Sequence, residues 1–369
     1  MSIPPHTNPS PDGTEPEAPA GISGATPVTI PETMTAVTGR HYGDTDVLAI
    51  ETLPTPLAAP GKLLVKVLGS SANALDWRLL SGTPLFVRLV MGLRKPKRLI
   101  PGADVAGRVV AVGDGVTGFA IGDAVFGEAA GGAFAEYATV TAKNFVTVPA
   151  GIDFVAAGAT PVAGLTALQG LRSKGAVKPG DRVLINGAAG GVGTFAVQLA
   201  RILGATEITA VCSGRNAEQS LALGATHVID YESEDYIEVG GQYDVIFDLM
   251  GNRTADDMRT ILAPGARFVG VSGPMTNRWV GPVFHLMRMG RAFKGSDVTF
   301  HQFTAGPTPD DLAYLAQLLA AGELVPAIER VVGLDGVVDA IDQIASSHSQ
   351  GKVAIVPGGI VGEGAGTVS

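Results

Sequence analysis

A glycine-rich turn carries the clearest chemical signal in this chain. An apolar run from Val183 to Asn186 leads into the turn, apolar residues at helical spacing follow it, and the turn itself contains Gly187, Gly190, Gly191, Val192 and Gly193. Glycines at this spacing allow a tight turn, a close approach of the backbone to a pyrophosphate, and close packing of helix on strand. The N–H groups at the start of the helix would bind the phosphates. The pattern predicts a dinucleotide site, the alternative being a purely structural turn.

The end of the next apolar strand, residues 208–212, indicates which dinucleotide is bound. Sites for NAD usually place Asp or Glu about 20 residues beyond the glycines, where the carboxylate binds the ribose hydroxyls. This chain has Ser213 and Arg215 there, and residues 212–216 contain no carboxylate. A hydroxyl and a guanidinium suit a 2′-phosphate. We therefore predict NADP(H) as cofactor, the alternative being that Arg215 is an ordinary exposed loop cation.

Composition limits the class of protein. A chain of 369 residues is expected to form about two domains, and its net charge of −9 argues against a nucleic-acid surface. Cys212 is the only cysteine, so an internal disulfide and a four-cysteine zinc site are both excluded. We predict no metal. The sequence shows no signal peptide and no apolar run long enough to span a bilayer, so we expect a soluble, cytoplasmic protein without a membrane partner.

The order of predicted elements suggests two interleaved domains. Residues 1–33 are rich in Pro, Gly and Ser and are predicted to be a disordered tail, and residues 358–369 a flexible one. Short strands at 63–70, 104–113, 122–127 and 132–138 predict a partly open β-barrel over residues 34–154. Strand–helix alternation over residues 155–300, with strands at 243–248 and 266–271, predicts a doubly wound parallel sheet. A helix at 310–321 and a strand at 352–356 would return residues 301–357 to the first domain.

These motifs together resemble a known family. Residues 107–113, 122–125, 133–137, 165–167 and 186–193 are similar to the zinc-free quinone oxidoreductase branch of the medium-chain dehydrogenase/reductase superfamily, and to its reticulon-4-interacting group. The resemblance covers roughly residues 34–357 and implies a GroES-like catalytic domain, a Rossmann domain and a cleft between them. Zinc-bearing members hold a cysteine and a Gly-His-Glu motif. The matching places here read Ala-Asn-Ala-Leu-Asp-Trp at 72–77 and Pro-Gly-Ala-Asp at 101–104, so both zinc signatures are missing.

The resemblance also implies roles for single residues. Asn73 matches an asparagine beside the nicotinamide, although it could merely stabilise a turn. Asp76 and Trp77 are weaker catalytic candidates, since Asp76 could cap a helix and Trp77 could form a cleft wall. The remaining expected cofactor contacts are Thr166, Tyr231, Ser272, Gly273 and Lys352. For Lys352 an exposed position at a strand end is an equal alternative.

The absence of a metal bears on the reaction. Without a Lewis acid, oxidation of a simple alcohol is disfavoured, whereas NADPH can reduce a quinone or the double bond of an α,β-unsaturated carbonyl. The region of Met91 and Arg94 and residues 279–287 are expected to form loops over the mouth for a small hydrophobic substrate. The second stretch could instead be a helix at a subunit interface, possible in a homodimer. Alternative functions are a carbonyl or aldehyde reductase and a catalytically idle NADP-binding sensor or scaffold. A short-chain dehydrogenase is excluded because no Tyr-x-x-x-Lys motif is present.

Overall fold

The computed structural model describes residues 29–273, 279, 281–346 and 349–359. Most of the two predicted tails therefore lies outside the described residues. The first predicted tail ends slightly too late, because strand β1 (Thr33–Gly39) already begins at its last residue and pairs with β2 (Leu48–Pro54) along its whole length. This hairpin is absent from the sequence-based expectation.

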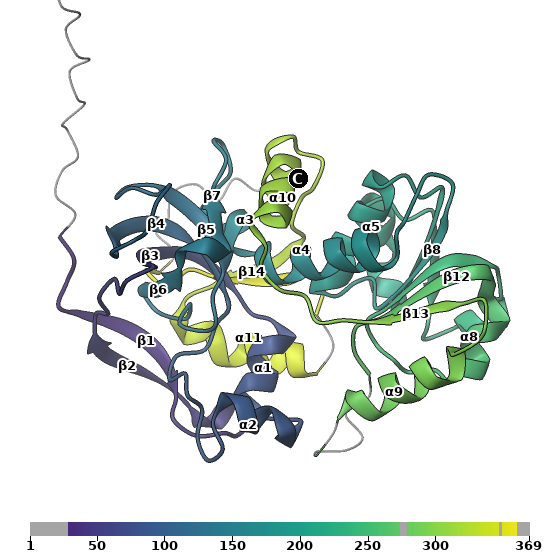
Figure 1. Cartoon of the computed structure of the whole chain (residues 1–369), viewed down its shortest axis with the longest axis horizontal. Helices are drawn as coiled ribbons and strands as arrows, with labels where there is room; N and C mark the ends of the chain where they lie inside the picture. The colour runs from purple at the N-terminus through teal and green to yellow at the C-terminus, as the bar shows by residue number, and fades with distance from the viewer. Residues whose placement is uncertain (1–28, 274–278, 280, 347–348, 360–369) are drawn as a thin grey trace, which may run out of the picture.

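A parallel sheet of six strands forms one part of the molecule (Figure 1). Its strand order is β10-β9-β8-β11-β12-β13, which is the 3-2-1-4-5-6 order of dinucleotide-binding sheets. Helices cover both faces, so strands such as β11 are buried on both sides and consist of near-continuous apolar runs. The strands are β8 (Arg182–Asn186), β9 (Glu207–Cys212), β10 (His227–Asp230), β11 (Tyr243–Asp248), β12 (Leu262–Gly270) and β13 (Thr299–Gln302). The helices between them are α5 (Gly191–Ile202), α6 (Ala217–Ala222), α7 (Tyr236–Val239), α8 (Ala255–Ile261) and α9 (Pro282–Phe293).

A second, mostly antiparallel sheet forms the other part. Its path is β14-β15-β3-β4-β5-β7, and β6 lies off this path and pairs with residues 62–66 of β3. The strands are β3 (Lys62–Ser71), β4 (Asp104–Val112), β5 (Ala124–Glu128), β6 (Tyr137–Thr141), β7 (Phe145–Thr147), β14 (Ile328–Val332) and β15 (Lys352–Ile355). This sheet therefore combines strands that precede the parallel sheet in the sequence with strands that follow it. A nucleotide-binding unit inserted into the other domain, with the limits predicted above, remains our proposal for how the chain divides.

The remaining helices pack beside or between the two sheets. Those N-terminal to the parallel sheet are α1 (Ala74–Ser81), α2 (Arg88–Met91), α3 (Phe154–Gly158) and α4 (Pro161–Leu168), and those C-terminal to it are α10 (Pro309–Ala320) and α11 (Val337–Ala345). None of the helices in the described residues combines the length and the apolar character that crossing a bilayer requires.

One predicted strand is wrong in part. Residues 132–136 form a loop, and the strand of this region, β6, starts only at Tyr137. Gly131 and Gly132 have φ values of +120° and +102°, which an extended strand does not use. The loop is instead held by bonds from Val37 N to Phe134 O and from Thr35 N to the Glu136 carboxylate, at 2.8 and 2.7 Å.

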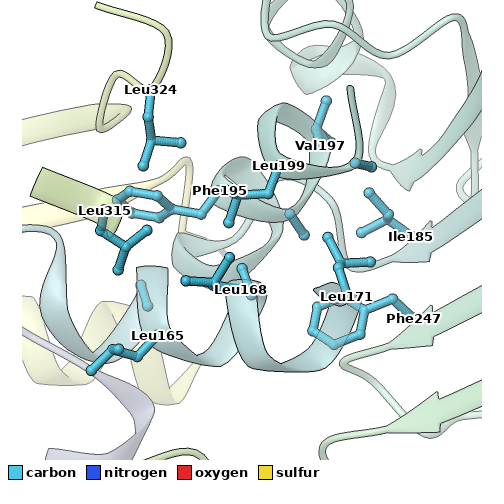
Figure 2. Close-up of a cluster of buried hydrophobic side chains, with 14 of the residues drawn as sticks. Leu165, Leu168, Leu171, Ile185, Phe195, Val197, Leu199, Phe247, Leu315 and Leu324 are labelled. Carbon is cyan, nitrogen blue, oxygen red and sulfur yellow. The ribbon is translucent and has the colours of Figure 1, made fainter. Parts of the chain in front are cut away.

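One hydrophobic core joins the two sheets. It contains Phe126 of β5, Leu165 of α4, Phe195 of α5 and Leu315 of α10, and all four side chains are fully buried. Figure 2 shows the Phe195 ring directed towards Leu315. Because this core is close-packed, it holds the two parts of the molecule in a fixed arrangement around the site described next.

Candidate functional site

The glycine turn has the geometry that a pyrophosphate needs. Gly187 takes a φ of +90°, and a Cβ added at Gly193 would lie 2.2 Å from the Gly187 carbonyl oxygen, so both positions require glycine. A Cβ at Gly190 would meet only that oxygen, at 3.6 Å, which leaves this side of the turn open. The first intrahelical bond of α5 is donated by Thr194 N to Gly190 O at 3.0 Å. The three N–H groups before Thr194 therefore lie at the helix end that favours anions.

The residue directly before strand β15 pairs with this turn. Gly351 forms a β-bridge with Gly190 and donates its N–H to Ala189 O at 2.8 Å. Val192 is partly buried and packs its side chain against the hydrophobic core, and its contact with the cofactor stays a prediction. Thr166 on α4 is nearly buried, and its hydroxyl donates to the backbone carbonyl one helical turn earlier at 2.7 Å.

The predicted adenosine contacts lie at one edge of the parallel sheet. Ser213 is buried and its hydroxyl accepts a bond from Asn216 Nδ2 at 2.9 Å, whereas Arg215 and Tyr231 are exposed. Tyr231 N donates to Cys212 O at 3.1 Å and so ties the ends of β9 and β10 together. The three predicted residues are therefore brought to neighbouring strand ends.

A carboxylate that the sequence reasoning missed lies at the same edge. A Cβ built on Gly214 would be 2.5 Å from Oδ2 of Asp230, the last residue of β10. The prediction considered only the end of β9, whereas a parallel sheet brings the carboxyl ends of adjacent strands together. The sequence did contain the signal, because the short strand at residues 227–230 ends on this aspartate.

Lys352 is buried, with 2 % of its surface exposed, so the alternative of an exposed strand-end lysine is wrong. Its ammonium donates to Asn73 Oδ1 at 2.5 Å, to the Ala72 carbonyl at 3.3 Å and to Asp104 Oδ2 at 3.3 Å. Its aliphatic stem passes Gly191, where an added Cβ would lie 2.9 Å from Lys352 Cδ. The lysine thus connects the glycine turn to the predicted catalytic asparagine.

Asp104 organises the polar groups around this lysine. Its Oδ2 accepts from Ser71 Oγ at 2.5 Å, from Asn73 Nδ2 at 2.8 Å and from the Lys352 ammonium. Its Oδ1 accepts from Val162 N at the start of α4, at 2.8 Å. The Asn73 amide is therefore fixed on both sides, which orients it without leaving it free to rotate.

Asp76 and Trp77 follow Asn73 on α1 but face different surroundings. Asp76 is buried and accepts the Asn73 N–H at 2.9 Å, so the alternative of a helix-capping residue is correct. Burial, followed by the nearby charge of Asp104, raises the pKa of Asp76 to about 7. Trp77 packs against the hydrophobic cluster shared with α11 and does not line the cavity.

A cavity of about 250 Å³ begins at the buried side of α1. Most of its wall is apolar, and its charged lining residues are Asp76, Arg98 and Glu128. Met91, the last residue of α2 rather than part of a loop, lines this wall, and Arg94 is exposed outside it. That this region covers a substrate mouth stays a prediction. The lining residues are Gly39, Leu75, Asp76, Leu79, Leu80, Met91, Pro96, Arg98 to Ala103 and Glu128 to Gly131.

A hydrogen bond between the two parts of the molecule shows where two further predicted residues, Ser272 and Gly273, lie. Arg78 of α1 donates from Nη2 to Ser272 Oγ at 2.6 Å, just beyond the end of β12. Burial lowers the pKa of the Arg78 guanidinium. Gly273 follows Ser272, and a Cβ there would lie 3.1 Å from the His285 ring. Sequence reasoning missed Arg78, whose neighbours along the chain give no sign of this distant partner.

The expectation of a loop over residues 279–287 is wrong for its second half. Residues 282–293 form α9, which starts with Pro282 and buries Leu286, Met289 and Phe293, at helical spacing. Phe284 and Met287, on the opposite side, are 70 and 64 % exposed. Residue 280 lies outside the described part. A subunit interface on α9 stays a proposal.

Known proteins resemble the chain in both of its parts. Residues 59–150 match the family described as alcohol dehydrogenase GroES-like domain, and residues 223–355 match zinc-binding dehydrogenase. A zinc-type alcohol dehydrogenase-like protein of Schizosaccharomyces pombe is 30 % identical over 84 % of this chain and 92 % of its own. The chain belongs to the medium-chain dehydrogenase/reductase superfamily. The predicted fold, a GroES-like domain with a Rossmann domain, is thereby confirmed.

Two further relatives of this dehydrogenase/reductase bear more specific names. An NADPH-dependent alkenal/one oxidoreductase of Arabidopsis thaliana is 29 % identical over 92 % of this chain and 84 % of its own. The structure of a quinone oxidoreductase from Coxiella burnetii matches with a TM-score of 0.78 and 29 % identity, covering 88 % of this chain and 99 % of that one.

The residues of this dehydrogenase/reductase do not fit the zinc ion that its family's description implies. In the described part of the chain, no three His, Cys, Asp or Glu side chains are grouped so as to hold a metal. Ala103, where zinc-bearing members are expected to have histidine, lines the cavity with a methyl group. The neighbouring Asp104 already accepts four hydrogen bonds, one of them from an ammonium group that would repel a cation. We therefore derive no step through zinc.

Proposed function

We propose that this enzyme transfers hydride from NADPH to a quinone or to the β-carbon of an α,β-unsaturated carbonyl, without zinc. The observation that carries the proposal is the cluster of Lys352, Asn73 and Asp104, which stands between the glycine turn and an apolar cavity and has no free metal ligands. Such a site can orient a planar acceptor but has no Lewis acid with which to stabilise an alkoxide.

The residues present fit NADP(H) as the cofactor. The open side of the turn at Gly190 and the N–H groups before Thr194 would hold the pyrophosphate. Arg215 and Ser213 would hold a 2′-phosphate, and Tyr231 would lie along the adenosine. The negative charge of Asp230 disfavours a 2′-phosphate, so the attraction between the phosphate and the Arg215 guanidinium must exceed this repulsion. The name of the NADPH-dependent relative supports the same choice.

Bound NADPH would supply the hydride, and the chain's own groups would position the acceptor and exclude water. Lys352 and Asp104 hold the Asn73 amide in one orientation, because the ammonium donates to the amide oxygen and the amide nitrogen donates to the carboxylate. The apolar cavity wall favours a hydrophobic acceptor and lowers the local dielectric. In that setting a fixed hydrogen-bonding group interacts more strongly with developing charge than it would in water.

Transfer of label tests the reaction. With NADPH deuterated at C4 and an enone as acceptor, deuterium should appear at the β-carbon of the product. Label found only on carbonyl carbons, across a panel of aldehydes and enones, would make the protein a carbonyl reductase. Binding of NADPH without turnover on quinones, enones or aldehydes would indicate an idle relative.

Metal independence is tested separately. Exhaustive chelation should leave the rate of enone or quinone reduction unchanged, because Asp104 is occupied and Ala103 offers no ligand. Stoichiometric zinc in the purified protein, together with loss of activity on its removal, would overturn this part of the proposal.

A further inference from the structure

Glu128 is a charged residue of the cavity wall that has no role in the site described so far. It is the last residue of β5 and stands directly opposite Asp104 of β4 in the antiparallel register. It is partly exposed, and it lines the cavity together with Asp76 of α1. Two carboxyl groups, those of Asp76 and Glu128, therefore line a mostly apolar cavity, and Asp104 lies beside Glu128 in the sheet.

The surroundings of Glu128 favour its protonated form. Burial raises its pKa to about 7, and the charges of Asp104 and Asp76 contribute further. The described residues provide no hydrogen-bond partner for its carboxyl group, and Arg98, the cation on the same cavity wall, forms no described ion pair with it. A carboxylic acid in this setting carries a proton for part of the time at neutral pH.

The neighbouring groups are less suited to donate a proton. Asp104 is fully buried, does not line the cavity, and is engaged by four hydrogen bonds. Asp76 is 1 % exposed and accepts the N–H groups of Asn73 and Gly102. Lys352 is 2 % exposed and is engaged by Asn73. Glu128 alone among these four combines a cavity-facing position with an uncommitted carboxyl group.

We propose that Glu128 is the catalytic acid that protonates the α-carbon of a bound enone, a role that rests on the proposed function. Hydride from NADPH forms the new C–H bond at the β-carbon, and the electron pair of the C=C bond moves into the enolate. The O–H bond of Glu128 then breaks as its proton goes to the α-carbon, and the Glu128 carboxylate regains a proton from water. The sum is enone, NADPH and one proton giving the saturated ketone and NADP⁺. Asp104, opposite Glu128 in the β4–β5 register, and Asp76, on the same cavity wall, act as positioning residues beside the Glu128 carboxyl group.

Reduction of 2-methylcyclohex-2-enone by the full-length protein tests this role, because the product has a stereocentre at the α-carbon. The wild-type enzyme should give one configuration there, since the proton arrives from one fixed side. In Glu128→Gln, kcat should fall on the order of 100-fold, and the product should be a mixture because water protonates the enolate. The wild-type kcat should fall as pH rises through about 7, and Glu128→Gln should lose this dependence. Exposed Glu238 on α7 provides the control, and Glu238→Gln should behave as wild type.

The possible outcomes separate this inference from the proposed function. Absence of NADPH-dependent reduction of both quinones and enones by the wild-type enzyme would refute the proposed function itself. Reduction of quinones but not of the enone would overturn the role of Glu128, because no carbon would then need its proton. The same holds if Glu128→Gln keeps the wild-type rate and product configuration. If that variant does not fold, Glu128→Asp and the wild-type pH profile decide, and a flat profile between about pH 6 and pH 8 overturns the inference.

Discussion

Removal of the Lys352 ammonium should destabilise the whole site. In Lys352→Met the aliphatic stem can still pack against Gly191, but Asp104 loses its only described cation while its carboxylate stays fully buried. Breaking a buried ion pair by removing one partner costs about 3–5 kcal/mol. Asp104 keeps three other donors, from Ser71, Asn73 and Val162, so we expect the low end of this range, about 3 kcal/mol.

Urea unfolding monitored by tryptophan fluorescence measures this cost, because Trp77 packs in the cluster between α1 and α11, close to the lysine's strand. Asp104→Asn removes the charge that Lys352 neutralises, so the double variant should recover about 1–3 kcal/mol relative to the sum of the two single losses. Exposed Lys143 provides the control, and Lys143→Met should change the free energy of unfolding by less than about 0.5 kcal/mol. Additive single losses, or a loss in Lys352→Met no larger than that of the control, would refute the ion-pair reasoning.

Three further predictions concern the cofactor and pH. Gly190→Ala should fold normally but bind NADPH poorly, because its Cβ would enter the open side of the turn, whereas Gly193→Ala should be destabilised by the 2.2 Å clash with Gly187 O. Thermal unfolding with and without NADPH distinguishes the two effects. Normal NADPH affinity in Gly190→Ala would show that the pyrophosphate binds elsewhere. Arg215→Ala should weaken NADPH binding by about 1–3 kcal/mol and leave NADH binding nearly unchanged, as measured by titration, and equal affinities of the wild type for both cofactors would contradict this. The pKa of Asp76 lies at about 7 in the folded state against 3.8 ordinarily, so the folded state binds more protons and wild-type stability should fall as pH rises between these values. Asp76→Asn should lose the part of this fall that Asp76 contributes, no more than about 4 kcal/mol, while the part from Glu128 remains; identical pH dependence in both proteins would argue against a buried ionising carboxyl group at residue 76.

The parts of the fold that depend on local pattern could be predicted from the sequence. The glycine turn and the strand at residues 243–248 were predicted correctly because a buried parallel strand and its following turn are encoded within a few neighbouring residues. The predicted strand at 132–138 fails where two consecutive glycines with positive φ redirect the chain towards β1. A glycine in a strand pattern does not reveal by itself which φ it adopts.

The chemistry of the site depends on contacts that are distant in sequence. Lys352 and its partner Asn73 are 279 positions apart, and nothing near Lys352 shows that its strand is buried at that end. Glu128 follows an apolar run and precedes two alanines, so its local sequence is that of an ordinary strand end. Its role becomes visible only when α1 and β4 bring Asp76 and Asp104 beside it. The protonation state of such a group is set by burial and neighbouring charge, and neither can be read from spacing.

The bridge between Gly190 and Gly351 has a consequence for biosynthesis. Residues 190–193 are synthesised well before the lysine that fixes Asn73, because Gly193 and Lys352 are 159 positions apart in the sequence. A nascent or truncated chain that ends before β15 lacks both the residue that pairs with the turn and the ammonium group beside Asp104. The oriented amide therefore forms only after β15 has been synthesised, and a fragment ending before β15 keeps the residues of the glycine turn without the lysine that fixes Asn73.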